Sequence, residues 1–367
     1  MEAVGGGRRH KVNFYDVISP ANLLGAWREF KRGKTSKSDV QSFAFRLEDN
    51  LFTLYERLRD NTWTPDPYVS FRVADPKPRE IHKASVWDRI LFQAVFRQLY
   101  TIFEKTFIHD SYASRRGKGV LAGVLRFEAF ARKASRNYSQ RVFVLKCDIR
   151  KFFDGIDHEV LFSLLRRKVD DMDLLELLSK IISSFEKTAG KGLPLGNVTS
   201  QLFANVYLNE LDQFMKRELG THYYIRFCDD FVIVSGNRFE LEHLIPLIGK
   251  FLEMRLRLSL HPKKVSIRQL AQGLDFLGYV TFPGFRVLRT HTKRRMFTRC
   301  ASVFATSDGK AEEGYAVRVL SSYKGLLSHS REYRSWKRLE KLYRNNDGLT
   351  EEEEIKVIEK MGKQKKE

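Results

Sequence analysis

Apolar residues recur at two spacings along the chain, and the spacing predicts which segments are helical and which are extended. Leucines from Leu47 to Leu58 repeat every three or four positions, as in an amphipathic helix, and the first 70 residues share this helical pattern. Residues 71–83 instead hold two prolines among alternating apolar and charged positions, which predicts an extended, basic hairpin or loop. A helix is expected next, over 87–103.

The middle of the chain predicts strands alternating with helices. Residues 142–149 form a nearly continuous apolar run that includes Asp148, which predicts a buried strand with a carboxylate near its C-terminal end. A helical stretch follows at about 152–185, and a second amphipathic helix begins near Asn197 or Thr199. Beyond these, the pattern predicts a helix at 238–258, an extended segment at 259–268, a strand at 274–282 with Gly278 in its middle, and helices to about residue 346.

Two short apolar runs, 223–227 and 231–235, predict a hairpin with Asp229 and Asp230 at its tip. Ordinary hairpin turns favour Asn-Gly or Asp-Gly, and this tip lacks the glycine. Two adjacent carboxylates repel each other unless cations neutralise them, and hard oxygen ligands favour Mg²⁺. Asp148, on a neighbouring strand, would complete a two-metal site. Two metal ions about 3.5–4 Å apart support in-line nucleotidyl transfer.

The charge of the chain indicates a polyanionic partner. The net charge is +20, and residues 285–346 carry 15 Lys and Arg against 5 Asp and Glu, so half of the surplus lies in this segment. Nucleic acid is the leading candidate. We expect no membrane segment and no secretory signal, because no apolar run is long enough and the N-terminus is polar. The three cysteines form no C-x-x-C pair, which favours a reducing cytoplasm over a disulfide framework.

Six sequence blocks follow one another between residues 111 and 282. They are SYASRRGKG at 111–119, KCDIRKFFDGIDH at 146–158, GLPLGNVTSQLFANVYLNELD at 192–212, RFCDDFVIVS at 226–235, LSLHPKKVSI at 258–267 and LDFLGYVTF at 274–282. Their order resembles the fingers and palm motifs of bacterial retroelement reverse transcriptases. The resemblance implies an RNA-directed DNA polymerase, a nucleotidyltransferase that uses two Mg²⁺ ions.

The resemblance also implies a fold and a division of the chain. The expected fold is the α+β right hand of polymerases, with fingers, a palm built on an antiparallel sheet, and a helical thumb. The expected parts are an N-terminal helical region over 1–70, fingers and palm over 71–283, a basic helical thumb over 284–346 and a charged tail over 347–367.

Catalytic roles can be carried over to matching positions. The implied metal-binding set is Asp148, Ile149, Asp229 and Asp230. Lys264 resembles the lysine that acts as general acid for the pyrophosphate, and Lys263 is the alternative one residue away. The implied primer grip consists of Phe276, Leu277, Gly278 and Tyr279.

Nucleotide-binding roles follow from the same comparison. Arg79 resembles the fingers arginine that grips the triphosphate, and Arg72 and Lys77 are weaker candidates that could equally be solvated surface residues. Phe153 occupies the place of the aromatic residue that packs under the sugar and excludes a 2′-hydroxyl, with a plain core role as the alternative. The nucleotide-binding set is completed by Leu195, Gly196 and Gln201.

One block departs from the usual pattern. Most reverse transcriptases have a Gln-Gly pair here, and many bacterial ones have a Ser-Pro pair shortly after it, whereas this chain has Leu195-Gly196 and Ser200-Gln201. Leucine cannot offer the amide donor and acceptor of glutamine, so lower fidelity is expected. The variant resembles the reverse transcriptases of diversity-generating retroelements, which copy a template RNA with errors at adenines.

Other interpretations remain open at this point. Leu195 could reflect neutral drift in a retron-like or group II intron-like reverse transcriptase, or the chain could be a non-catalytic RNA-binding relative. The leading interpretation implies template RNA, a cDNA or primer strand and dNTPs as partners, together with a small basic pentameric accessory variability protein. The gene would belong to a bacterium, an archaeon or a phage.

Overall fold

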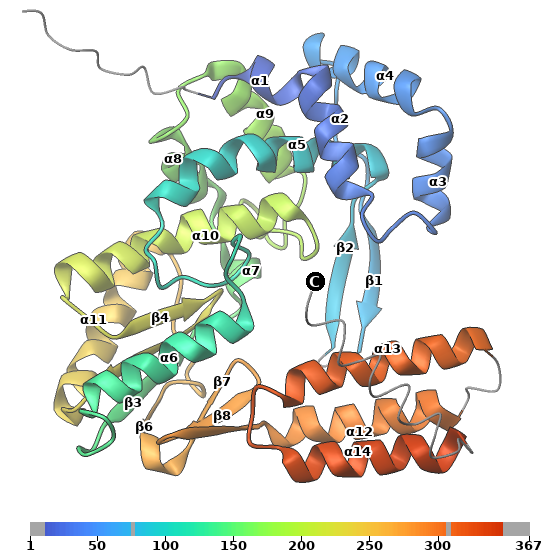
Figure 1. The fold of residues 1–367 in the computed structure, drawn as a ribbon. Coiled ribbons are helices and arrows are strands. Elements are labelled where there is room, and N and C mark those ends of the chain that lie inside the picture. The colour runs from blue at the N-terminus through green and yellow to red at the C-terminus, as the bar shows by residue number, and fades with distance from the viewer. Residues whose placement is uncertain (1–11, 75–77, 306–309, 348–367) are drawn as a thin grey trace, which may run out of the picture. The chain divides into compact units, whose positions relative to one another are not determined.

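The computed structural model describes residues 12–74, 78–305 and 310–347 (Figure 1). The chain divides into two compact units. The first combines Met1–Gly123, Leu145–Ile233 and Phe239–Ile267, and the second combines Val124–Val144, Val234–Arg238 and Arg268–Glu367. Among the described residues, we find no helix with the length and apolar character needed to cross a lipid bilayer.

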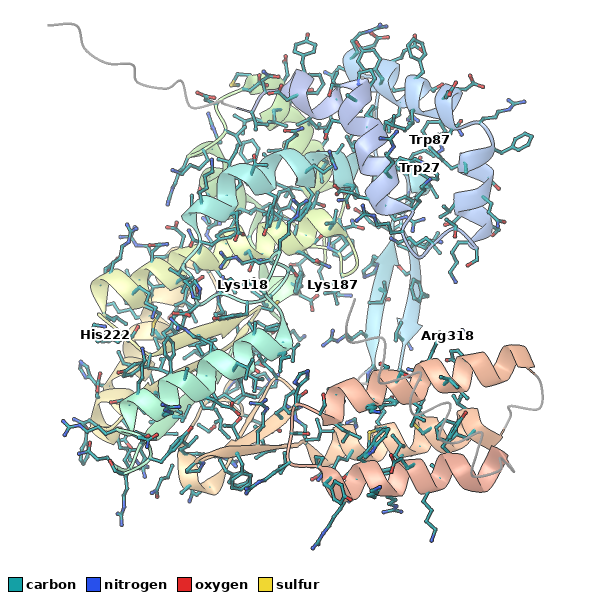
Figure 2. All side chains as sticks on the ribbon, viewed as in Figure 1. Trp27, Trp87, Lys118, Lys187, His222 and Arg318 are labelled. Atoms are coloured by element: carbon teal, nitrogen blue, oxygen red, sulfur yellow. The ribbon has the colours of Figure 1, made fainter. Side chains whose placement is uncertain are left out.

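Helices form the N-terminal part of the first unit, as the leucine spacing predicts. They are α1 (Phe14–Ile18), α2 (Pro20–Phe30), α3 (Ser38–Phe45), α4 (Leu47–Arg59) and α5 (Val86–Phe103). Asn13 caps α1 and Ser19 caps α2, each by accepting a backbone N–H in the first turn. An aromatic cluster joins three of these segments, because the ring of Phe43 lies 5.3 Å from that of Trp27 and 5.0 Å from that of Trp87 (Figure 2).

The basic segment predicted as a hairpin or loop is an antiparallel hairpin. Its strands are β1 (Val69–Val73) and β2 (Arg79–Lys83), and Phe71 pairs with Ile81 at the centre of the ladder. Every residue of β1 is exposed. Residues 75–77, which connect the strands, lie outside the described part of the chain.

The largest sheet among the described residues has four strands, and we refer to it as the central sheet. Its strands are β3 (Phe143–Asp148), β4 (Tyr224–Phe227), β5 (Asp230–Ser235) and β6 (Ser266–Gln269), in the order β4-β5-β3-β6. The predicted strand ending in Asp148 is therefore present, and Phe231 to Val234 of β5 are buried. The helices nearby in sequence are α6 (Val120–Ala134), α7 (Phe152–Gly155), α8 (His158–Arg166), α9 (Met172–Ser183), α10 (Val198–Gln213) and α11 (Arg238–Leu256).

The second unit contains most of α6, a smaller sheet and the three helices that follow this sheet. Strands β7 (Leu274–Phe276), β8 (Tyr279–Phe282) and β9 (Phe285–Leu288) pair in chain order. Helices α12 (Thr290–Ala305), α13 (Lys310–Leu327) and α14 (Tyr333–Asp347) lie side by side (Figure 1). Their shared core includes Met296, Leu320 and Leu339.

Two details of the predicted pattern are wrong in this unit. Residues 274–282 form two strands instead of one, because Leu277 and Gly278 have φ values of +52° and +89° and reverse the chain. Phe285–Leu288 is a third strand where a helix was expected. The predicted charged tail lies outside the described residues from position 348 onward.

Candidate active site

The turn between β4 and β5 presents two aspartates at one end of the central sheet. Phe227 pairs with Asp230, so Cys228 and Asp229 form a two-residue turn and Asp230 is the first residue of β5. Cys228 has a φ of +57°, a left-handed conformation that glycine normally supplies. We refer to Cys228, Asp229 and Asp230 as the aspartate turn. The predicted hairpin is confirmed.

Asp148 lies at the end of β3, the strand next to β5. The backbone N–H of Ile149 donates to the carbonyl oxygen of Asp229 at 3.2 Å, which joins the end of β3 to the aspartate turn. Burial raises the pKa of Asp229, and the charge of Asp148 raises it further. Burial also raises the pKa of Asp230 to about 6, although Lys146 acts in the opposite direction. The three carboxylates therefore interact electrostatically.

Two lysines lie against these carboxylates. Lys264 Nζ is 2.9 Å from both carboxylate oxygens of Asp148, and Lys146 Nζ is 3.2 Å from Asp230 Oδ2. The other oxygen of Asp230, Oδ1, is buried and has no hydrogen-bond partner among the described residues. Of the two lysines proposed as general acid, Lys264 is the one that contacts an aspartate. The backbone N–H of Lys263 instead donates to His261 Nδ1 at 3.2 Å.

The donor chemistry of this cluster fits a hard divalent cation. Carboxylate oxygens from two neighbouring strands are the ligands that Mg²⁺ prefers, and the unpartnered Asp230 oxygen is free to accept a cation. In the described ranges, however, no three His, Cys, Asp or Glu side chains are placed together so as to hold a metal ion. Asp148 and Asp230 instead face lysine ammonium groups. The metal-binding role of Asp148, Ile149, Asp229 and Asp230 stays a prediction.

The candidate sugar-facing residue lies just after β3. Phe152 and Phe153 begin α7, and their rings are 5.3 Å apart in an edge-on arrangement. Phe152 is buried, whereas Phe153 is only partly buried. The more accessible ring of the pair therefore belongs to the residue predicted to contact the nucleotide.

The loop that carries Leu195 and Gly196 lies against β2 of the basic hairpin. The backbone N–H of His82 donates to the Leu195 carbonyl oxygen at 3.3 Å. Gly196 has a φ of +119°, and a Cβ at this position would lie 3.4 Å from the Ile81 side chain. This close approach and the left-handed backbone both favour glycine. The Leu195 side chain is partly exposed beside the hairpin.

The remaining nucleotide-binding candidates lie on exposed surfaces. Arg79 begins β2 and Arg72 lies in β1, and both are exposed. Lys77 lies outside the described residues. Gln201 is exposed on α10 and lines an open pocket of about 600 Å³ together with Arg116 and other residues.

The predicted primer grip is the β7-β8 turn. Phe276 and Tyr279 are buried, and Tyr279 belongs to the core of the second unit, whereas Leu277 and Gly278 at the turn are partly exposed. The backbone N–H of Arg289 donates to the Gly278 carbonyl oxygen at 3.1 Å. Any contact with a nucleic acid would therefore involve the turn and not the two aromatic rings.

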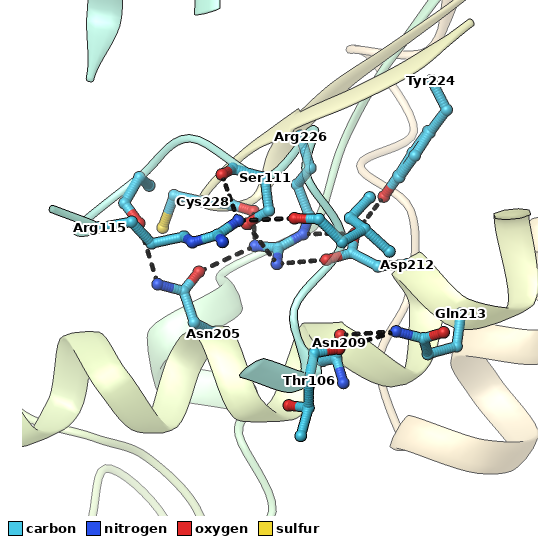
Figure 3. Close-up of polar contacts among 12 residues, drawn as sticks. Thr106, Ser111, Arg115, Asn205, Asn209, Asp212, Gln213, Tyr224, Arg226 and Cys228 are labelled. Carbon is cyan, nitrogen blue, oxygen red and sulfur yellow. Dashed lines mark hydrogen bonds and ion pairs between the residues drawn. The ribbon is translucent and has the colours of Figure 1, made fainter. Parts of the chain in front are cut away.

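Sequence reasoning missed one charged residue beside the site. Arg226 lies inside the apolar strand β4, two residues before Cys228, and its side chain is fully buried against Asp212 (Figure 3). A charged residue in an otherwise apolar run was the available signal, because buried arginines are rare unless they are paired. Its partner in α10 is 14 positions away in the sequence, and sequence alone could not identify it.

Comparison with protein-family models identifies one family. The family model described as "Reverse transcriptase (RNA-dependent DNA polymerase)" matches residues 74–281, more than half of the chain. This range contains the central sheet, the Leu195 loop and Lys264. A mixed fold of helices and antiparallel strands, with the aspartate turn at a sheet end, is the expected polymerase fold.

Curated relatives are similar over part of their length. The group II intron-encoded protein LtrA of Lactococcus lactis subsp. cremoris is 23% identical over 320 residues, covering 68% of this chain and 51% of that protein. Protein YkfC of Escherichia coli is 26% identical, covering 64% of this chain and 71% of that protein. The retron Ec73 reverse transcriptase of Escherichia coli is 32% identical over 112 residues, covering 27% of this chain and 34% of that protein. The chain thus spans about half the length of the first of these relatives.

Proposed function

Because the chain belongs to the reverse transcriptase family, we propose that it copies an RNA template into DNA, using two Mg²⁺ ions at the aspartate turn and Asp148. The observation that supports this proposal is that Asp148, Asp229 and Asp230 lie at one sheet end, inside the matched range, near enough for Asp148 to raise the pKa of Asp229 and Asp230. Buried carboxylates whose pKa is raised by a neighbouring carboxylate serve cation binding better than they serve folding.

Each residue of the site has a separate task in this proposal. The bound metal ions would activate the primer 3′-hydroxyl and stabilise charge on the leaving pyrophosphate. Asp148, Asp229 and Asp230 would hold them, and Lys264 would donate a proton to the pyrophosphate. Phe153 packs under the sugar, and Arg79 holds the triphosphate as a charge-assisted hydrogen-bond donor.

We further propose that synthesis is error-prone, as in a diversity-generating retroelement. The backbone of the Leu195 loop is held against β2 through His82, so the Leu195 side chain has a defined place beside the hairpin that carries Arg79. Leucine there presents no hydrogen-bonding group to a nascent base pair. The discrimination between correct and incorrect nucleotides that an amide would supply is therefore lost. If the chain belongs to a diversity-generating retroelement, a small basic accessory protein would be a partner.

The decisive experiment replaces Leu195 with glutamine and sequences the cDNA made on a defined RNA. Restoring an amide adds a hydrogen bond that only a correctly seated nucleotide satisfies, so we expect misincorporation opposite adenine to fall about ten- to a hundredfold. Leu195→Met is the matched control, because it changes the shape of the side chain without adding an amide. It should leave the error spectrum unchanged.

A second candidate is an accurate reverse transcriptase of the group II intron or retron type. The similarity to a group II intron-encoded protein and to a retron enzyme favours it. In that case the wild-type error rate is low, and Leu195→Gln slows synthesis without changing substitutions at adenine, because the new amide has no partner. A wild-type chain that binds RNA but never extends a primer would overturn both candidates.

A further inference from the structure

Arg226 is the largest fully buried side chain of the described residues, and all five of its N–H donors have an acceptor (Figure 3). Nε and Nη2 donate to the two carboxylate oxygens of Asp212, at 2.8 and 2.6 Å. Nη2 also donates to Ser111 Oγ at 3.1 Å. Nη1 donates to Asn205 Oδ1 at 3.3 Å and to the carbonyl oxygen of Cys228 at 3.1 Å.

The acceptors come from three separate segments of the first unit. Asp212 and Asn205 lie on α10, Ser111 lies in the loop before α6, and Cys228 belongs to the aspartate turn. Asn205 also donates to the carbonyl oxygen of Ala113 at 2.9 Å, which ties the helix to the same loop. Arg226 therefore connects the aspartate turn to two other elements that surround it.

The charge of Arg226 is balanced where it lies. Burial lowers the pKa of Arg226, but the adjacent Asp212 carboxylate outweighs this effect and raises it, so the guanidinium stays charged. Tyr224 donates to Asp212 Oδ1 at 2.8 Å and completes the pair. Because Asp212 neutralises Arg226, the arginine is not a counter-ion for the aspartate turn. Its effect on the turn is geometric.

The contact with Cys228 explains how a strained turn persists. A non-glycine residue at a φ of +57° is disfavoured unless its surroundings hold it in place. The hydrogen bond from Arg226 Nη1 fixes the carbonyl group of this same residue, immediately before Asp229. A lysine has three donors on one atom and cannot reach Asp212, Asn205, Ser111 and Cys228 together.

We propose that Arg226 is a positioning residue, which holds the backbone of the aspartate turn so that Asp229 and Asp230 are presented for cation binding. This inference rests on the proposed function. Beyond that function, it requires that the guanidinium group of Arg226 affects cation binding through its hydrogen bond to Cys228, and not only by stabilising the fold.

The test compares Arg226→Lys with a matched variant, Arg115→Lys. Arg115 is also a buried arginine paired with a carboxylate, Glu104, and it donates to the carbonyl oxygens of Ile108 and Ser111. In the part of the chain that the structure describes, it makes no hydrogen bond to the aspartate turn. Both variants lose a buried guanidinium group and its five N–H donors. Full-length protein bound to an RNA template and DNA primer is titrated with Mn²⁺, and free Mn²⁺ is measured by electron paramagnetic resonance. Primer extension and thermal unfolding are measured in parallel.

We expect Arg226→Lys to raise the half-saturating Mn²⁺ concentration at least fivefold and to lower kcat at least thirtyfold, with RNA affinity within twofold of wild type. Arg115→Lys should lower the unfolding temperature similarly and leave the Mn²⁺ titration unchanged. Asn205→Ala keeps the Arg226–Asp212 pair but removes Asn205 Oδ1, one of the two oxygens that accept from Arg226 Nη1. It should raise the half-saturating Mn²⁺ concentration two- to threefold, and it is the deciding variant if Arg226→Lys fails to fold.

Two results would overturn the inference while leaving the proposed function intact. The first result is that the wild-type chain extends primers while the Mn²⁺ titrations of both Arg226→Lys and Asn205→Ala match that of wild type. The other is an equal shift in Arg115→Lys, which would mean that any buried fork affects the site. A wild-type chain without primer extension would instead contradict the proposed function itself.

Discussion

The β4-β5 and β7-β8 hairpins both turn in two residues, and both begin the turn with a non-glycine residue at positive φ. In the β7-β8 turn, Leu277 at +52° is followed by Gly278 at +89°, which is the pattern of a type I′ turn with its usual glycine. The aspartate turn has no glycine, and its second position is Asp229.

The difference shows how a two-residue turn can be stabilised without the glycine that such turns usually contain. The β7-β8 turn is formed by local backbone preference and by the buried rings of Phe276 and Tyr279 on either side. The aspartate turn consists of Cys228 and Asp229 and lacks a glycine, and a hydrogen bond from Arg226 holds Cys228. We infer that one turn depends on its own sequence and the other on residues remote in sequence.

The largest expected effect comes from Asp229→Asn in the aspartate turn. We expect primer extension to fall at least a thousandfold, because the variant loses one of the ligands proposed for the metal ions, while RNA affinity stays within a few-fold of wild type. Single-turnover extension on an RNA template and filter binding measure the two quantities. The matched control is Asp170→Asn, at the exposed first residue of the Asp170-Asp171 pair between α8 and α9, which should extend normally. Extension by Asp229→Asn within tenfold of wild type would remove Asp229 from the catalytic set.

The second effect separates chemistry from nucleic-acid binding. The helices after β9 carry exposed basic residues, among them Arg294 on α12 and Arg334 and Lys341 on α14. Replacing these three with glutamine should weaken RNA binding about tenfold at physiological salt and reduce the slope of log affinity against log salt by up to about 2, since each phosphate contact contributes about 0.7. The extension rate at saturating RNA should change less than threefold.

The control for this variant removes the same number of positive charges from the first unit. The control variant also loses three positive charges, because glutamine replaces three exposed residues of the first unit, Arg46, Lys168 and Arg217. An equal loss of slope in this control would show that net charge, and not the basic helices, determines RNA affinity.

The fold was largely predictable because its signals are local. The leucine spacing in α4, the apolar run of β3 and the paired strands around Asp229 each lie within one segment, and the structure confirms them. The division of residues 274–282 into two strands was not predicted, because Leu277-Gly278 is not one of the dipeptides, such as Asn-Gly or Asp-Gly, that indicate a hairpin turn.

The support of the site was less predictable because it depends on contacts between segments. Asp148, Asp229 and Lys264 could be picked out from sequence blocks, and the structure places Lys264 against Asp148. The role of Arg226 depends on Asp212 and Ser111, which are 14 and 115 positions away, and nothing in one sequence pairs them.

A smaller effect is expected at Gly278 in the β7-β8 turn. Gly278→Ala should lower the free energy of unfolding by about 1 kcal/mol, because alanine is disfavoured in the left-handed conformation. A Cβ at this position would meet no atom within 4 Å, so steric clash adds nothing. Denaturant unfolding measures the change. Gly249→Ala, in helix α11 and also without a neighbour within 4 Å, should instead be neutral or stabilising. A loss above about 3 kcal/mol at Gly278 would mean that this turn also depends on contacts outside itself.

The smallest effect is expected from Cys228→Gly. Glycine relieves the left-handed strain at +57°, worth about 1 kcal/mol, but it also gives the unfolded chain more freedom, which costs about 0.5–1 kcal/mol. The free energy of unfolding should therefore stay within about 0.5 kcal/mol of wild type. The extension rate should nevertheless fall two- to fivefold, because glycine allows the turn more conformations than the single one fixed by Arg226.

Cys228→Asn distinguishes turn geometry from loss of the thiol, since asparagine tolerates the left-handed region and restricts the backbone more than glycine does. It should keep at least half of the wild-type extension rate. If the asparagine and glycine variants lose the same activity, the cysteine side chain itself matters. If neither loses activity, the aspartate turn needs no more external support than the β7-β8 turn, and the contrast between the two hairpins disappears.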